Sequence, residues 1–375
     1  PYYYMLYKAS IDKEGVTLLT PENAQHGVSF LSSKRYFVDT YSRVDMEPKI
    51  VLRNNQGKMI MELAKPDTRR LKELGWRAPE RFTVKAADGL TDIYGIMWKP
   101  ADFDPNKKYP IISSVYPGPF FEYVNTSFRV DDSYNMRLAQ LGFIVVAMGH
   151  RGGSPMRGKF YHRYGYGKLR DYPLADDKYA IEQLADRYAY IDLSKVGIFG
   201  HSGGGFMSTA ALCTYPDFYT AAVSSAGNHD NNIYSQFFVE SHYAIDEEVK
   251  VIEEKLETKD GRDSVIMREK TFYSVNLPTN MELAKNLKGH LMLIVGGMDG
   301  NVHPVQTIRM VDAFINHGKD VEFVLLPRGR HTYDGVSAWY FENKLRSHFA
   351  KYLLGDFKSS GFYDIEINEY EQIIK

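Results

Sequence analysis

Apolar and polar positions alternate in two different ways along this 375-residue chain. Up to about residue 64, short apolar stretches of strand length are separated by turn-forming clusters such as Asn54-Asn55-Gln56-Gly57. From about residue 81 onward, continuous apolar runs alternate with segments of helical periodicity. The first pattern is typical of antiparallel strands, and the second of a parallel sheet with crossover helices. We therefore divide the chain into residues 1–64, a connector at 65–80 and a larger part at 81–375.

The first part, residues 1–64, is predicted to consist of short antiparallel strands. These strands are Tyr2–Ala9, Val16–Leu19, Tyr36–Tyr41, Ile50–Arg53 and Met59–Leu63. They cannot close a sandwich or a barrel by themselves, and they resemble the end of a β-propeller. The connector that follows is expected to contain one short helical piece.

The larger part, residues 81–375, is predicted to form a mostly parallel sheet with helices on both faces. The buried strands are expected at Ile111–Val115, Phe143–Met148, Val196–Phe199, Ala221–Ser225, Leu291–Val295 and Val321–Leu326, after two strands at Phe82–Lys85 and Ile93–Trp98. Helices are expected near 131–141, 173–186, 203–214, 281–288, 304–317 and 336–353. Charged segments interrupt this rhythm between about 240 and 280, which favours a solvated, partly helical insertion over a binding role.

Composition and charge exclude several classes of function. With 46 basic and 47 acidic side chains, the net charge of −1 provides no field that would attract nucleic acid or an anionic membrane. No apolar run reaches the roughly 18 residues that a membrane-spanning helix needs. The single cysteine, Cys213, is expected to be a small buried apolar residue. Because the chain starts at Pro1 and leads directly into a predicted strand, we expect a piece of a longer protein.

The sequence Gly200-His201-Ser202-Gly203-Gly204-Gly205 lies between a predicted strand and a predicted helix. This is the context of a nucleophile elbow, in which a serine turns sharply with strained backbone and glycines avoid side-chain collisions. The helix N-terminus would favour a developing oxyanion. A glycine-rich turn could also hold a phosphate, but neither the Walker nor the dinucleotide-binding pattern is present. A purely structural turn remains the alternative to a hydrolase.

Chain order identifies the partners of Ser202 in such an α/β-hydrolase fold, because an acid and then a histidine must follow the serine at later strand ends. Asp299 follows the strand Leu291–Val295, and His331 follows the strand Val321–Leu326. Asp230 is a weaker rival acid. The other histidines that come late in the chain are His303, His317 and His348, which suit loop or helix roles better.

This trio predicts a mechanism that needs neither a metal ion nor an organic cofactor. His331 would remove the proton of Ser202, Ser202 would attack an acyl carbon, and Asp299 would orient the imidazole. Water would then hydrolyse the acyl-enzyme.

The elbow and the segment Gly297-Met298-Asp299-Gly300-Asn301-Val302-His303 together resemble the prolyl oligopeptidase family, closest to its dipeptidyl peptidase IV branch. The resemblance covers roughly residues 80–355 and implies an α/β-hydrolase catalytic domain with a remnant of an N-terminal β-propeller. It implies Tyr116, in Val115-Tyr116-Pro117-Gly118-Pro119, and the backbone N–H of Gly203 as oxyanion donors. It also implies substrate contacts from Asn301 and Val302. We further expect a peptide substrate, a periplasmic or secreted bacterial location and a homodimer.

The sequence departs from the family pattern at three places. Gly300 stands where that branch has a second acid, and the segment from Gly227 to Tyr234 is polar where the branch has the tyrosines of a proline pocket. Nearly all of the propeller is missing. The prediction is a serine peptidase acting on short peptides. The alternatives are an esterase or other acyl hydrolase with the same triad, and a catalytically silent module of the same fold.

Overall fold

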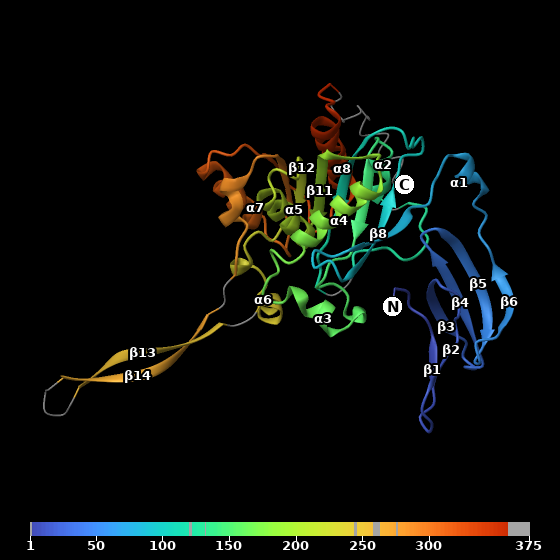
Figure 1. Cartoon of the computed structure of the whole chain (residues 1–375), viewed down its shortest axis with the longest axis horizontal. Coiled ribbons are helices and arrows are strands. Elements are labelled where there is room, and N and C mark those ends of the chain that lie inside the picture. The colour runs from blue at the N-terminus through green and yellow to red at the C-terminus, as the bar shows by residue number, and fades with distance from the viewer. Residues whose placement is uncertain are drawn as a thin grey trace.

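The computed structural model describes residues 2–119, 122–131, 133–243, 246–257, 263–274 and 277–358. Figure 1 shows a central body of strands and helices, a separate group of strands near the N-terminus, and a long hairpin that projects from the opposite side of the body. Within the described ranges, no helix combines the length and apolar character that crossing a membrane would require.

The elements follow one another in an order that changes character after β6. The strands are β1 (Tyr7–Ala9), β2 (Val16–Leu18), β3 (Gln25–Phe30), β4 (Tyr36–Arg43), β5 (Met46–Asn54), β6 (Met59–Ala64), β7 (Glu80–Lys85), β8 (Asp92–Trp98), β9 (Tyr109–Ser114), β10 (Ile144–Met148), β11 (Ile191–His201), β12 (Ala221–Ser225), β13 (Asp246–Glu257), β14 (Asp263–Ser274), β15 (His290–Gly296) and β16 (Glu322–Leu326). The α-helices are α1 (Arg69–Glu73), α2 (Ser133–Ala139), α3 (Lys159–His162), α4 (Leu174–Arg187), α5 (Gly203–Thr214), α6 (Gln236–His242), α7 (Val305–Asn316) and α8 (Gly335–Phe349). The last helix continues as a π-helical turn over Ala350–Leu354.

The central sheet has eight strands in the order β16-β15-β12-β11-β9-β10-β8-β7. The strands from β16 to β10 pair in parallel, and β8 and β7 add antiparallel pairings at one edge. Parallel strands place all their carboxyl ends at one edge, where the loops after β9, β11, β12, β15 and β16 meet. The mostly parallel sheet predicted from the sequence is confirmed.

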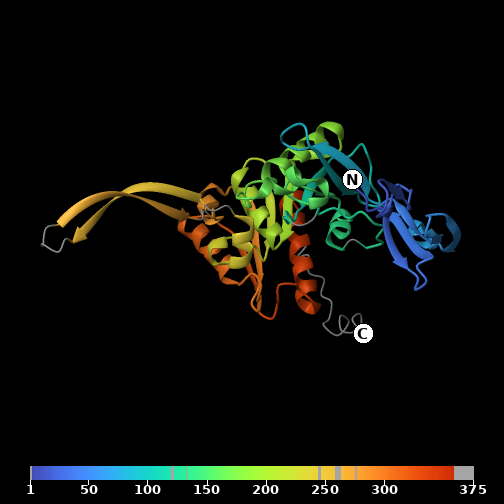
Figure 2. The same ribbon diagram turned by 90° about the horizontal axis from the view of Figure 1, so that it is seen from below.

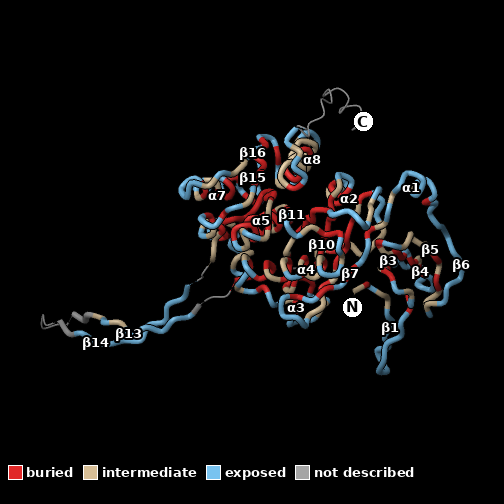
Figure 3. The backbone as a smooth tube through the Cα atoms, turned by 45° about the horizontal axis from the view of Figure 1, so that its top comes forward, coloured by how far each residue is buried: buried red, intermediate tan, exposed pale blue. Residues whose placement is uncertain are grey.

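Helices cover both faces of this sheet, and neighbouring strand residues explain why. Ile111 and Leu293 pack in one core with residues of α4, α5 and α7, whereas Ile112 and Ile294 pack in a second core with residues of α2 and α8. Since alternate strand residues point to opposite faces, a strand that is apolar at every position must be buried on both. Figure 3 shows the buried positions concentrated in these strands. Cys213 lies in the first core, as expected.

The N-terminal strands form a small antiparallel sheet, β3-β4-β5-β6, beside a β1-β2 pair. Strand β3 was not predicted, and most of its residues are exposed. A buried charged cluster supports this sheet: Arg53 donates to Asp39 and to Glu22, and His26 Nδ1 lies 2.9 Å from Asp39 Oδ1. The side chains of Glu22, His26 and Asp39 lie close enough together to hold a metal ion. Both carboxylates, however, already form ion pairs with the Arg53 guanidinium.

The insertion between about 240 and 280 differs from the prediction. Instead of helical structure, its described middle part is an antiparallel pair of 12-residue strands, β13 and β14, that extends away from the body in two views (Figures 1 and 2). The helical expectation is wrong here. Apolar residues such as Val249, Val251 and Met267 are interspersed with charges on a ribbon that is exposed on both faces. Because neither face of this ribbon is buried, its apolar residues do not recur at the regular spacing from which β13 and β14 could be identified.

Candidate active site

Ser202 stands at the sharp turn between β11 and α5, at the carboxyl edge of the sheet. Its backbone has φ of 57° and ψ of −121°, a conformation that residues with a side chain rarely adopt. The turn also needs glycines, because a Cβ on Gly200 would lie 2.4 Å from the Val115 carbonyl oxygen. The Ser202 N–H donates to the Ser225 carbonyl at the end of β12, which fastens the turn to the neighbouring strand.

Asp299 and His331 meet in the loops that follow β15 and β16. His331 Nδ1 donates to Asp299 Oδ2 over 2.8 Å, and the Asp299 side chain is buried. The other oxygen of this carboxylate, Oδ1, accepts the backbone N–H groups of Asn301 and Val302, each at 2.9 Å. These bonds hold the carboxylate in the orientation that fixes one tautomer and one position of the imidazole.

The His331 ring lies against His201, the residue directly before Ser202. Their ring centroids are 4.8 Å apart, so the imidazole of His331 is brought to the elbow. Burial, helped by the proximity of His331, lowers the pKa of His201 to about 4. His201 is therefore neutral near pH 7 and adds no charge beside His331. Its Nδ1 lies 2.9 Å from Ser225 Oγ, which donates to the Tyr333 hydroxyl.

Tyr116 lies beside Ser202, in the loop after β9. The two side chains are hydrogen-bonded, and burial raises the pKa of Tyr116 above its ordinary value. The phenol therefore keeps its proton at neutral pH and can donate it in a hydrogen bond. Gly203, the first residue of α5, is close by: a Cβ on it would lie 4.0 Å from Tyr116 Cζ. A hydroxyl and a helix N-terminal N–H thus flank the serine, which is the arrangement that stabilises an oxyanion.

A small pocket of about 60 Å³ opens directly beside Ser202, Gly203 and Tyr116. Its walls come from the loop after β9, from Leu169, from Phe206 of α5 and from the segment after β12 with α6. That last segment contributes Asn228 and Asn231 together with aromatic side chains. The sequence shows that this segment is polar, but no pattern in it predicts either asparagine as a site residue.

The two residues expected to contact substrate occupy different environments. The side-chain oxygen of Asn301 accepts a hydrogen bond of 3.1 Å from the hydroxyl of Tyr234, which links the Asp299 loop to the pocket wall. Val302 is fully buried and is not among the residues that line the small pocket. Both roles stay predictions.

The rival acid and the other histidines are engaged elsewhere. Asp230 forms an ion pair with Arg309 at 2.6 Å and caps the short 3₁₀ turn at Asn231–Ile233. His303 Nδ1 accepts from the backbone N–H of Val305, the first residue of α7. His317 and His348 lie next to backbone carbonyls, those of Ala313 and His290.

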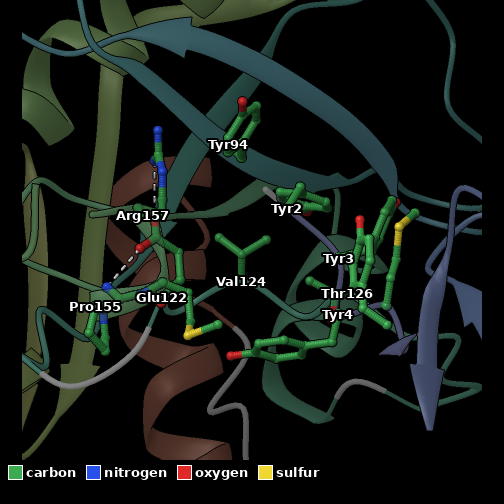
Figure 4. Close-up of a pocket in the computed structure, with 13 residues that line it drawn as sticks. Tyr2, Tyr3, Tyr4, Tyr94, Glu122, Val124, Thr126, Pro155 and Arg157 are labelled. Carbon is green, nitrogen blue, oxygen red and sulfur yellow. Dashed lines mark hydrogen bonds and ion pairs between the residues drawn. The ribbon is translucent and has the colours of Figure 1, made fainter. Parts of the chain in front are cut away.

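A larger pocket of about 500 Å³ lies where the N-terminal segment meets the body (Figure 4). Tyrosines 2–4 and Tyr94 line it together with Glu122 and Arg157. The Glu122 carboxylate already accepts from the Tyr161 hydroxyl, the Ser154 N–H and Arg157. None of Ser202, Asp299 and His331 lines this pocket, so we assign the chemistry to the elbow instead.

Comparisons with known proteins agree with the fold. Human dipeptidyl peptidase 8 is 26% identical over 349 residues, which cover 88% of this chain and 36% of that protein. Dipeptidyl peptidase 4 of Trichophyton rubrum is 26% identical over 84% of this chain and 38% of its own length. Two solved structures share the fold. A putative dipeptidyl aminopeptidase IV from Bacteroides ovatus has a TM-score of 0.73 at 24% identity, covering 90% of this chain and 45% of that one. Dipeptidyl peptidase 4 of Porphyromonas gingivalis has a TM-score of 0.72 at 20% identity, covering 93% and 46%.

The chain thus spans less than half the length of these relatives. The model of the prolyl oligopeptidase family matches residues 129–358, which include the elbow and the loops that carry Asp299 and His331. With more than half of its residues matched, the chain belongs to the prolyl oligopeptidase family, a family of serine peptidases.

Proposed function

We propose that this chain is the catalytic part of a serine peptidase that cleaves short peptides, of the dipeptidyl or oligopeptidase type, through an acyl-enzyme on Ser202. The observation that carries the proposal is the buried Asp299 carboxylate, which orients His331 against His201, the residue directly before a serine with strained backbone. The names of the relatives, all dipeptidyl peptidases, support peptides as the substrate class.

The proposed reaction follows from the roles of these groups. His331 Nδ1–H donates to Asp299, which leaves Nε2 to accept the Ser202 proton as Oγ bonds to the acyl carbon. The carbonyl electron pair moves onto oxygen, where Tyr116 and the Gly203 N–H donate to the oxyanion. As the carbonyl re-forms, the peptide C–N bond breaks and His331 protonates the leaving amine. Water then attacks the ester, with His331 again as base, and releases Ser202 and the acid.

Two features of the site support these roles of Asp299 and His331. Asp299 is buried and already accepts two backbone N–H groups, so it can stabilise the charged imidazolium without taking its proton. His201, with its pKa lowered to about 4, contributes no competing positive charge next to His331.

The test is the rate at which a fluorophosphonate labels the intact chain. We expect wild type to label at Ser202, and Ser202→Ala to give no label at that site. His331→Ala should slow labelling by at least about 1000-fold, because the unassisted hydroxyl is a weak nucleophile. The matched control is His317→Ala, which removes an exposed histidine at the end of α7 and should label like wild type.

A second comparison distinguishes a peptidase from the esterase alternative. Peptide amides and esters with the same acyl group should both be cleaved, with deacylation as a common step. Cleavage of the esters alone would contradict the peptidase proposal while retaining the triad. A folded wild type that the fluorophosphonate does not label would contradict the proposed nucleophile itself.

A further inference from the structure

The pocket beside Ser202 has a wall of mixed polar and apolar side chains. Phe206, Leu169 and Phe238 supply apolar surface, while Asn228 places a carboxamide among them. Asn228 is only 6% exposed. A buried carboxamide is costly unless its donors and acceptors are paired.

The Asn228 amide is held from one side by a short relay. Its Nδ2 donates to Asn231 Oδ1 over 2.7 Å, and Asn231 Nδ2 donates to the Tyr243 hydroxyl over 2.8 Å. Asn231 and Tyr243 are themselves buried. The relay fixes the plane of the Asn228 carboxamide against the pocket.

The opposite side of the same carboxamide is unpaired by protein. Across the described part of the chain, no group donates to Asn228 Oδ1. The sequence around it, Gly227-Asn228-His229-Asp230, supplies other polar groups, but Asp230 is engaged with Arg309 and with Gln306 of α7. The Asn228 carboxamide therefore keeps hydrogen-bonding capacity for a bound group.

The position of the pocket identifies which part of a substrate enters it. When Ser202 attacks the carbonyl carbon of a substrate residue, the carbonyl oxygen lies between Tyr116 and the Gly203 N–H. The side chain of that substrate residue then lies next to Ser202, Tyr116 and Gly203. All three line the pocket. The side chain of the residue before the scissile bond, called P1, must point into this space, and the small volume limits it to a short one.

We propose that the pocket selects a P1 serine or threonine, whose hydroxyl pairs with the Asn228 carboxamide; the inference rests on the proposed peptidase function. A hydroxyl both donates and accepts, so it pairs with the carboxamide whichever way the Asn228 and Asn231 amides are turned. Proline and valine have no such group and would leave the carboxamide unpaired. Sites built to bind a hydroxyl reject analogues that lack it more strongly than apolar pockets reject a methyl group.

Matched substrates measure this preference directly. Short peptide amides that differ only at P1 are compared as kcat/KM in two pairs of similar size, threonine against valine and serine against alanine. We expect threonine to exceed valine by about tenfold in the wild-type chain, the effect of one hydrogen bond in a buried site. Proline at P1 should also be cleaved more slowly than threonine.

Variants then assign the preference to Asn228. In Asn228→Leu, which keeps the size and removes the hydrogen-bonding group, the threonine-to-valine ratio should fall to about one or below. The matched control is Asn232→Leu, the same change at an exposed position four residues along the chain, which should keep the wild-type ratio. Peptide aldehydes carrying the same P1 residues provide a second readout, as competitors of fluorophosphonate labelling.

The outcomes separate this inference from the proposed function. If Ser202 is labelled normally but the wild-type chain cleaves the valine peptide as well as the threonine peptide, or better, the P1 inference alone is overturned. The P1 inference alone is also overturned if Asn228→Leu keeps the threonine-to-valine ratio of wild type. Absence of labelling overturns both. The wild-type ratio decides the question even if Asn228→Leu fails to fold.

Discussion

At the scale of single residues, Tyr116 is the side chain whose role can be tested most sharply. Burial raises its pKa, so the phenol is protonated and can donate to an oxyanion. We expect Tyr116→Phe to lower kcat by about 100-fold and to leave KM nearly unchanged, because the donor acts mainly on charge that develops in the transition state. The measurement is steady-state cleavage of a short peptide amide.

The control for this change is Tyr123→Phe, which removes the hydroxyl of a half-buried tyrosine whose ring lies 5.9 Å from that of Tyr116. It should cleave like wild type. A rise in KM at constant kcat in Tyr116→Phe would assign Tyr116 to binding of the ground state instead.

The residues of the proposed triad could be chosen from the sequence because chain order and strand ends constrain them. Ser202, Asp299 and His331 each follow an apolar run, and the parallel sheet brings such ends to one edge. The contacts that surround them could not be chosen in this way. The contact between the rings of His201 and His331 and the relay from Asn228 to Tyr243 join segments whose relative position depends on tertiary packing.

At the scale of an element, the elbow depends on glycines that differ in how closely the backbone approaches them. A Cβ at Gly200 would meet the Val115 carbonyl at 2.4 Å and the backbone of Gly204 at 2.6 Å, whereas the nearest atom to a Cβ at Gly203 is 4.0 Å away. We expect Gly200→Ala to lower the free energy of unfolding by about 3 kcal/mol, because backbone atoms must move. Gly203→Ala should change it by no more than about 0.5 kcal/mol.

Urea unfolding of the two intact variants checks this difference. Because both changes are Gly→Ala within the same turn, each serves as the control for the other. Equal stabilities would mean that the turn between β11 and α5 can relax, and would remove the steric argument for the glycine at position 200.

The elements of the central sheet were predictable because burial on both faces leaves continuous apolar runs, as in β9 and β15. The peripheral elements were not. Strand β3 and the pair β13–β14 expose most of their residues, so no buried face imposes an alternating pattern. The segment expected as a helix at 281–288 is a 3₁₀ helix over Met281–Asn286, a distinction that periodicity over so few residues does not resolve.

At the scale of the whole molecule, stability should depend on acid through buried histidines in the body. His229 is fully buried and its Nδ1 accepts from Asn280 Nδ2, and burial lowers its pKa to about 3. In the unfolded chain a histidine titrates near pH 6.5. Between these two values the unfolded state binds one more proton than the folded state. His201, with a pKa lowered to about 4, adds a second proton in the same direction.

The stability contributed by keeping these rings neutral is therefore fully present above about pH 6.5 and is lost as the pH falls toward 4. His229→Gln cannot take up the proton. Across pH 6 to 4, we expect the free energy of unfolding of this variant to fall less steeply than that of wild type, by about 1.4 kcal/mol per pH unit. Carboxylates titrate in the same range, but they contribute equally to both proteins and cancel in the difference.

Urea unfolding at a series of pH values measures both slopes, and the two curves should run parallel above pH 7.5, where neither state binds the proton. A lower overall stability of His229→Gln would not affect the comparison, because only the change of the free energy of unfolding with pH is compared. Parallel curves down to pH 4 would mean that His229 takes up its proton in the folded state, against the lowered pKa of its buried ring.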